Sequence, residues 1–109
     1  MIDRLPAPER QLLFKFLCAF AWADGEVGDA ERRFVRRLME KLPLTKDERL
    51  DVESWMVIPL GEADVDPGKV PAESRRVFLE ACRALVFMDG KVTDEEQRQF
   101  DALRVALSK

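Results

Sequence analysis

The chain has 109 residues and a mass of 12.6 kDa, which is the size of one compact domain. It contains no histidine and two cysteines, so it cannot build a Ser-His-Asp or Cys-His nucleophile, a histidine-ligated zinc site or a four-cysteine zinc site. Its net charge of -3 speaks against nucleic-acid binding, because that function needs a basic surface.

The composition also bears on the compartment. The charge-free run from Phe16 to Ala23 is too short to span a bilayer, and the N-terminal residues lack a cationic start followed by an apolar run. We therefore expect a cytoplasmic protein with no transmembrane segment and no signal peptide. Cys18 and Cys82 lie in strongly apolar stretches, which favours two reduced core cysteines over a disulfide or a reactive thiol.

The first predicted helix begins at Pro6 and Pro8, because proline is tolerated in a first helical turn. Its residues 12–23 are apolar apart from Lys15, which is typical of a buried central helix without a polar face. The Asp24-Gly25 pair ends the helix, because glycine readily adopts the left-handed conformation that follows many helices.

Two further helices are predicted before the middle of the chain. Residues 29–42 carry an apolar stripe at helical spacing and a basic opposite side, and Pro43 stops this helix. Thr45 and Glu48 have the spacing of a capping box, in which each side chain bonds the backbone N–H of the other residue. This box starts a third helix, whose apolar positions are Leu50, Val52, Trp55 and Met56.

The second half begins with a long connection, residues 58–70, which contains two prolines, two glycines and several acidic residues. We expect this connection to be mobile or functional, with at most a short helical turn, because irregular segments of this length are uncommon in compact domains. Pro71 opens a fourth helix with little polar face, and Asp89-Gly90 ends it. A second capping box starts the last helix, whose buried line is Phe100, Leu103 and Leu107.

A repeat with a constant offset of 65 residues relates the two halves. Residues 20–31, FAWADGEVGDAE, align with residues 85–96, LVFMDGKVTDEE. Each copy is a buried helix, a D-G-x-V turn and an amphipathic helix, and we expect the two buried helices to pack together with approximate two-fold symmetry. No segment alternates with a period of two, so the prediction is an all-α domain of about six helices. A single domain covers residues 1–109, with repeat halves at about 8–42 and 71–107.

This pattern resembles the TerB-like family, which is named for bacterial tellurite-resistance proteins. The family also includes the N-terminal domain of a membrane-anchored DnaJ-type co-chaperone. The resemblance rests on A-W-A-D-G-E-V in the first copy and F-M-D-G-K-V-T-D-E-E in the second, and it covers about residues 8–107. It implies an all-α fold of about six or seven helices, an association with stress or tellurite resistance, and binding of a metal ion through acidic residues. It implies no defined reaction.

The acidic positions that match the family pattern lie at equivalent places in the two copies. They are Asp24 and Glu31 in the first and Asp89 and Glu96 in the second, with Asp29 and Asp94 between them. Carboxylates gathered with turn carbonyls can hold a hard cation such as Ca2+ or Mg2+. Each turn is too short for the ligand ladder of an EF-hand, so a site would have to combine both turns or use water.

The alternative for these carboxylates is purely structural. Glu31 and Glu96 stand where a capping box places its glutamate, and the turn aspartates can accept hydrogen bonds from turn N–H groups. Asp29 and Asp94 belong to helical first turns, where the helix dipole favours a negative charge. A charged surface for a partner is a third interpretation.

The helix at 29–42 carries the strongest local cationic patch, which consists of Arg32, Arg33, Arg36, Arg37 and Lys41. One interpretation is a surface for an anionic partner, either an acidic protein or a phospholipid head group at a membrane surface. The other is a solvated helix face that pairs with Glu31 and Glu40.

We therefore expect a non-catalytic TerB-like module that binds a protein partner in a bacterial stress response, with or without a divalent cation. The alternative is a protein-interaction domain similar to the co-chaperone N-terminal domain, without metal. The chain lacks the His-Pro-Asp turn of a J-domain. An enzyme is not expected, because caps explain the carboxylates and no Gly-rich phosphate loop or activated nucleophile accompanies them.

Overall fold

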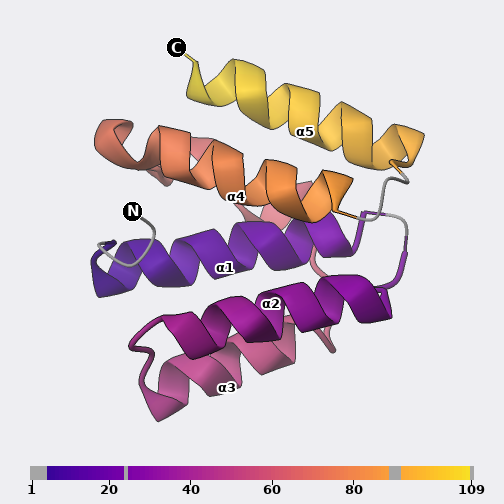
Figure 1. Cartoon of the computed structure of the whole chain (residues 1–109). Helices are drawn as coiled ribbons and strands as arrows, with labels where there is room; N and C mark the ends of the chain where they lie inside the picture. Colours follow the sequence, from indigo (N-terminus) through magenta and orange to yellow (C-terminus); the bar gives the residue numbers. More distant parts are fainter. Residues whose placement is uncertain (1–4, 24, 89–91, 109) are drawn as a thin grey trace.

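The structure is a computed structural model that describes residues 5–23, 25–88 and 92–108. Every regular element in these residues is helical, which confirms the all-α prediction (Figure 1). The α-helices are α1 (Ala7–Ala21), α2 (Asp29–Lys41), α3 (Lys46–Trp55), α4 (Arg75–Phe87) and α5 (Asp94–Leu107). Short 3-10 helices form in the second half at η2 (Glu62–Asp64), η3 (Pro67–Lys69) and η4 (Ala72–Ser74).

Helix α1 forms the centre of the molecule, as its nearly uniform apolar sequence predicts. It packs against all four other α-helices, and eight of its fifteen residues are buried. Helix α1 packs most extensively against α4. Phe16 of α1 and Phe78 of α4 meet edge to face there, with 5.8 Å between the ring centroids. Both rings are essentially inaccessible to solvent, so the contact between α1 and α4 is the middle of the core.

The local signals at the helix ends operate as predicted. Gly25 has φ of 96° and donates its N–H to the carbonyl oxygen of Trp22 at 2.9 Å, just after α1 ends. Thr45 Oγ1 accepts from the Glu48 N–H at 3.1 Å while the Glu48 carboxylate accepts from the Thr45 N–H at 2.8 Å, so the capping box of α3 is complete. The predicted stop of α4 at Asp89-Gly90 lies outside the described residues.

Three sequence expectations need correction. Helix α4 begins at Arg75, because η4 separates it from Pro71. Its outer face is polar, with Arg76, Glu80 and Arg83 exposed, because only one side of it faces α1. In α3, Leu50 is 58% exposed, since the core reaches that helix only through its opposite side.

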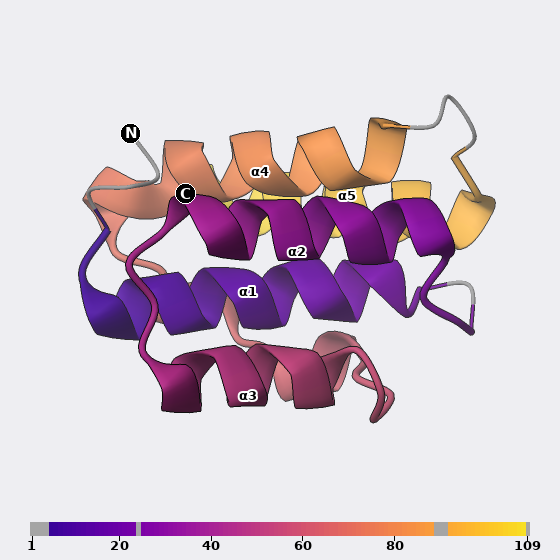
Figure 2. The same ribbon diagram turned by 60° about the horizontal axis from the view of Figure 1, so that its bottom comes forward.

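Figures 1 and 2 show how the two helix–turn–helix units are arranged. Helices α1 and α4 lie side by side, α2 flanks α1, and α5 flanks α4. In both views, the C-terminal ends of α1 and α4 and the N-terminal ends of α2 and α5 lie at the same end of the molecule. We call this the turn end.

Candidate functional site

Two of the predicted acidic residues at the turn end are engaged as helix caps. The Glu31 carboxylate accepts from the Gly28 N–H at 3.0 Å, and the Glu96 carboxylate accepts from the Thr93 N–H at 3.1 Å. Thr93 completes its box by accepting from the Glu96 N–H through Oγ1 at 3.1 Å. Glu96 is only 6% exposed, so this carboxylate is a buried structural group.

The other predicted acidic residues divide into two kinds. Asp29 and Asp94 are exposed and are the first residues of α2 and α5, where the helix dipole favours them. Asp24 and Asp89 lie outside the described residues. Within the described ranges, no three acidic or cysteine side chains are close enough to hold a metal ion. The cation site therefore stays a prediction.

The predicted basic residues of α2 also divide into two groups. Arg36 donates from Nε and Nη2 to the two carboxylate oxygens of Glu53 at 3.1 and 2.9 Å, and this pair ties α2 to α3. The Glu53 carboxylate raises the pKa of Arg36 above its usual value. Arg32 is half-buried, and its positive charge acts to lower the pKa of the nearby Cys18 thiol. Arg36 is therefore paired within the fold although its side chain is 51% exposed, and Arg32 is partly covered.

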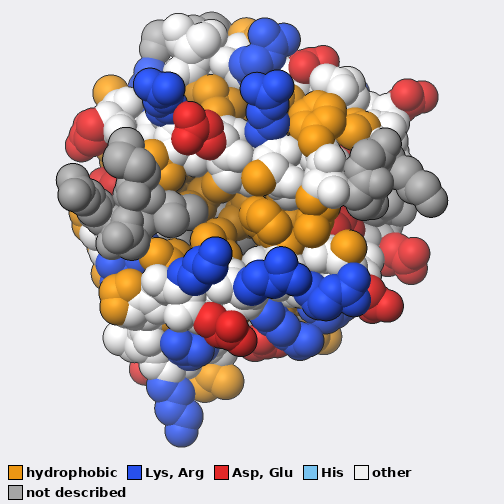
Figure 3. All heavy atoms as spheres, viewed as in Figure 1, with side chains coloured by type: hydrophobic (Ala, Val, Ile, Leu, Met, Phe, Trp, Pro, Cys, Tyr) orange, Lys and Arg blue, Asp and Glu red, His pale blue; other side chains and the backbone are white. Residues whose placement is uncertain are grey.

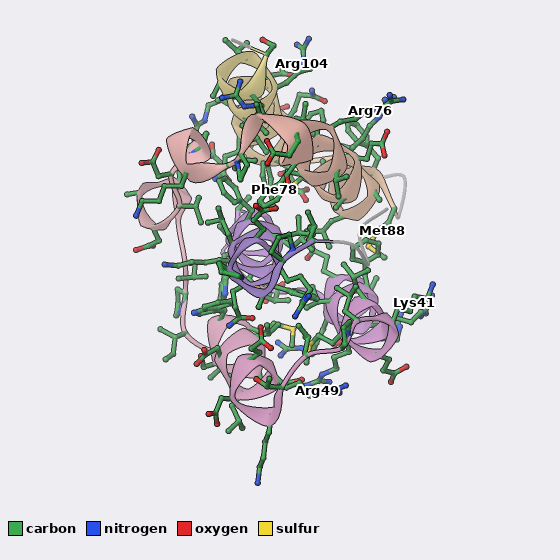
Figure 4. All side chains as sticks on the ribbon, turned by 90° about the vertical axis from the view of Figure 1, so that its left-hand side faces the viewer. Lys41, Arg49, Arg76, Phe78, Met88 and Arg104 are labelled. Atoms are coloured by element: carbon green, nitrogen blue, oxygen red, sulfur yellow. The ribbon has the colours of Figure 1, made fainter. Side chains whose placement is uncertain are left out.

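The remaining three cations, Arg33, Arg37 and Lys41, are exposed. None of them forms an ion pair with a residue in the part of the chain that the structure describes. The space-filling view shows cationic side chains in a row over α2, and Figure 4 shows Lys41 pointing away from the molecule. We call Arg33, Arg37 and Lys41 the basic row.

An apolar strip lies beside the basic row (Figure 3). Arg36 marks the side of α2 that faces α3, so positions 34, 38 and 41 lie on the side toward α4. On α4, Phe87 contacts Phe100 of α5, whereas positions 77, 81, 84 and 88 turn toward α2. The strip consists of half-buried Phe34, Leu38, Val77 and Ala81 and exposed Ala84 and Met88.

Sequence reasoning did not predict this strip, because it found an apolar stripe on α2 and little polar face on α4 without saying which of these residues stay exposed. Helical spacing identifies an apolar stripe but does not say how much of its width a neighbouring helix covers. Val35 and Met39 are buried, whereas Phe34 and Leu38 on the same helix are half-buried.

A separate pocket of about 280 Å3 lies between α1, α5 and the connection that carries η2 and η3. Its lining is mostly apolar and includes Phe16, Phe20, Val65, Ala102 and Leu103. No sequence signal predicted it, because these segments meet only in the folded chain.

The Arg98 guanidinium fastens the connection beside this pocket by bonding both Glu62 and Glu95. Arg98 and the Gln99 amide together lower the pKa of Glu95 to about 2. In the same cluster, the two carboxylates raise the pKa of Arg98. This charged cluster joins α5 to the connection.

The two cysteines are free thiols in the core, as predicted. Burial raises the pKa of Cys18 to about 12, with a further contribution from the Glu53 carboxylate. Burial alone raises the pKa of Cys82. Neither thiol has the thiolate character that a nucleophile or a metal ligand needs near neutral pH.

Taken together, the fold and this face define a small all-α domain with a basic row beside an apolar strip. Comparisons of the chain with models of protein families, with curated proteins and with solved structures find no match. None of the described helices is long and apolar enough to cross a membrane.

Proposed function

We propose that this protein is a non-catalytic binding module of the TerB-like type that holds an acidic partner protein on α2. The repeated D-G-x-V turns support the TerB-like class, and with it a place in a bacterial stress or tellurite response. The observation that carries the binding proposal is the basic row, three exposed cations that no described acidic residue neutralises.

The charge distribution supports an anionic partner. Helix α2 contains five cationic and three acidic residues, a net charge of +2, within a chain whose net charge is -3. A positive helix on a negative molecule orients an approaching acidic partner and speeds its association. Binding to the basic row does not have to break an ion pair with any described residue.

The test is affinity capture from cell lysate with the intact protein, followed by identification of the bound proteins. The variant Arg33→Glu/Arg37→Glu/Lys41→Glu should lose the captured acidic proteins, and added salt should weaken their binding to the parent protein. The matched control is Arg76→Glu/Arg83→Glu/Arg104→Glu, which changes the net charge equally on α4 and α5. Equal loss in both variants would reduce the effect to net charge and contradict the proposal.

A divalent cation at the turn end is the second candidate. The arrangement of the helices favours this candidate. The first residues of α2 and α5, Asp29 and Asp94, lie at the same end of the molecule (Figure 1). Ca2+ or Mg2+ would be held there by carboxylates and turn carbonyls.

Thermal unfolding in Ca2+, Mg2+, Mn2+ and Zn2+ tests this candidate. A specific ion at a hundredfold its Kd stabilises the folded state by about 2.7 kcal/mol. The gain should vanish in Asp24→Asn/Asp89→Asn. If no ion raises the Tm, or if the double variant responds like the parent, the cation site is wrong.

A further inference from the structure

We infer that the apolar strip between α2 and α4 is the docking site for an amphipathic helix of the partner protein. That helix carries an apolar stripe on the face that meets the strip and acidic side chains along the flank that meets the basic row. This inference rests on the proposed function and specifies the chemistry of the partner.

The shape of the strip fits a helix. Its walls are two helices, and α2 has 13 residues, which gives a length of about 20 Å or nearly four turns. Ala81 and Ala84 are the smallest side chains along the α4 wall and leave room for large apolar residues of a partner. An amphipathic helix fills such a surface with side chains spaced at i, i+4 and i+7.

The described part of the chain leaves the strip partly uncovered. Phe34 and Leu38 are half-buried beside α1, and Met88 at the end of α4 is 40% exposed. Figure 4 shows Met88 projecting from the end of α4 on the side where α2 lies. Methionine is flexible and polarisable, which suits a surface that adapts to a bound side chain.

The charges that border the strip indicate how a partner helix is oriented and which side chains it carries. Arg37 and Lys41 lie next to Phe34 and Leu38 on the helical surface of α2, so cations border the strip along that wall. On the opposite wall, Arg76 pairs with Glu80 at 3.2 Å. Arg83 lines a pocket that α4 forms with α5, on the other side of the helix from the strip, so fewer cations border the strip along this wall. The complement is a helix that is acidic on one flank and uncharged on the other.

A membrane surface fits this arrangement less well. Helices that lie on bilayers insert apolar side chains that project beyond their charged neighbours. Along the α2 wall, Phe34 and Leu38 are half-buried while Arg33, Arg37 and Lys41 are exposed, so the apolar side chains of this wall project less than its cations do. A ridge of side chains on a partner helix reaches such apolar side chains more readily than a flat lipid surface does.

The test uses a fluorescein-labelled peptide of about four helical turns, with leucines at i, i+4 and i+7 and glutamates along one flank. Fluorescence anisotropy measures its binding to the intact protein. Ala84→Trp, which fills the strip at an exposed position, should weaken binding by about tenfold or more. Met88→Glu should weaken it as well. Val105→Trp, on the exposed side of α5, is the matched control and should change Kd by less than about twofold.

The outcomes separate this inference from the proposed function. If Arg37→Glu/Lys41→Glu abolishes peptide binding but Ala84→Trp and Met88→Glu do not change it, the basic row binds and the strip does not. A peptide of the same composition with a scrambled stripe must bind at least about tenfold more weakly, or the helical stripe is irrelevant. Binding to vesicles of anionic phospholipid that Ala84→Trp removes, without binding to the peptide, would make the occupant a membrane and overturn the inference. Circular dichroism checks that each variant keeps its helices.

Discussion

Gly25 holds the only positive φ among the described residues, and it does so where α1 turns toward α2. No atom lies within 4 Å of the position that a Cβ would take there, so space is not the reason for glycine. The reason is the backbone, because the left-handed conformation brings a Cβ too close to the following carbonyl oxygen. A single residue thus sets the direction in which the first helix–turn–helix unit folds back.

We expect Gly25→Ala to lower the free energy of unfolding by about 1–2 kcal/mol, which is the cost of a left-handed conformation for a residue with a Cβ. Chemical denaturation followed by circular dichroism measures the change. Gly61→Ala is the control, because Gly61 has negative φ and its nearest potential contact is 3.9 Å away. It should be neutral or slightly stabilising. Equal losses in the two variants would contradict the backbone explanation.

Glu95 shows how one ion pair makes stability depend on pH. Its pKa falls from the usual 4.5 to about 2 because Arg98 and Gln99 bond the charged carboxylate. A carboxyl group whose pKa is lowered by folding stabilises the protein above its unfolded pKa, and this contribution disappears as the pH falls through the folded pKa. The contribution of Glu95 is therefore complete above about pH 5 and disappears toward pH 2.

We expect Glu95→Gln to be less stable than the parent protein at pH 7 and to differ progressively less as the pH falls from 5 to 2. Urea denaturation at several pH values measures the difference. Glu73→Gln, at an exposed position of η4, is the control and should run parallel to the parent protein. A Glu95→Gln difference that is independent of pH would contradict the assigned ion pair.

At the level of elements, the α-helices differ in what holds them. Helix α1 is held by its buried side chains, whereas α2 has only Val35 and Met39 buried. The N-cap residue of α2 is Gly28, which has no side chain that could accept a hydrogen bond from the first turn. Helices α3 and α5 begin with complete capping boxes at Thr45 and Thr93. The many polar side chains of α2 are thus consistent with its position at the surface, where it carries the basic row.

We expect Thr93→Ala to destabilise the protein by about 1 kcal/mol, because the Glu96 N–H loses its hydrogen-bond acceptor at the start of α5. Thr93→Ser keeps a hydroxyl at the same position and should be close to the parent protein. The shift in the urea midpoint at constant m-value measures both effects. A serine variant as unstable as the alanine variant would assign the loss to packing of the Thr93 methyl group.

For the whole molecule, stability depends on the contact between the two repeat halves. Phe78 of α4 is inaccessible and packs against Phe16 of α1, so the contact joins the two repeat halves. Domains of this size unfold with a free energy of about 5–15 kcal/mol, so one large core side chain represents a substantial share. Neither half can bury its apolar helix without the other.

We therefore expect Phe78→Ala to lower the free energy of unfolding by about 3–5 kcal/mol and to leave a marginally stable protein. Val105→Ala, at a position that is 54% exposed, should stay within about 0.5 kcal/mol of the parent protein. Thermal and urea denaturation measure both. A Phe78→Ala loss below about 1 kcal/mol would mean that the halves are held together elsewhere.

Sequence reasoning succeeded for features that depend on nearby residues. The capping boxes at Thr45 and Thr93 and the turn at Gly25 each involve residues that are at most three positions apart. It failed where the neighbour is distant in the chain. Leu50 was predicted to be apolar and buried, but it is exposed on α3. Arg36 was expected to meet an anionic partner or to pair with Glu31 and Glu40, but it pairs with Glu53 of α3.

By itself, the amino-acid sequence determined the all-α class, the main helices, their caps and the burial of α1, because hydrogen bonding and apolar periodicity within a helix are short-range properties. Only the tertiary structure decided which faces remain exposed. It paired Arg36 with Glu53, left Arg33, Arg37 and Lys41 without a described partner, and placed the apolar residues of α2 beside those of α4. The physical reason is that exposure depends on what packs against a helix, and here the partners lie up to about half the chain away in sequence.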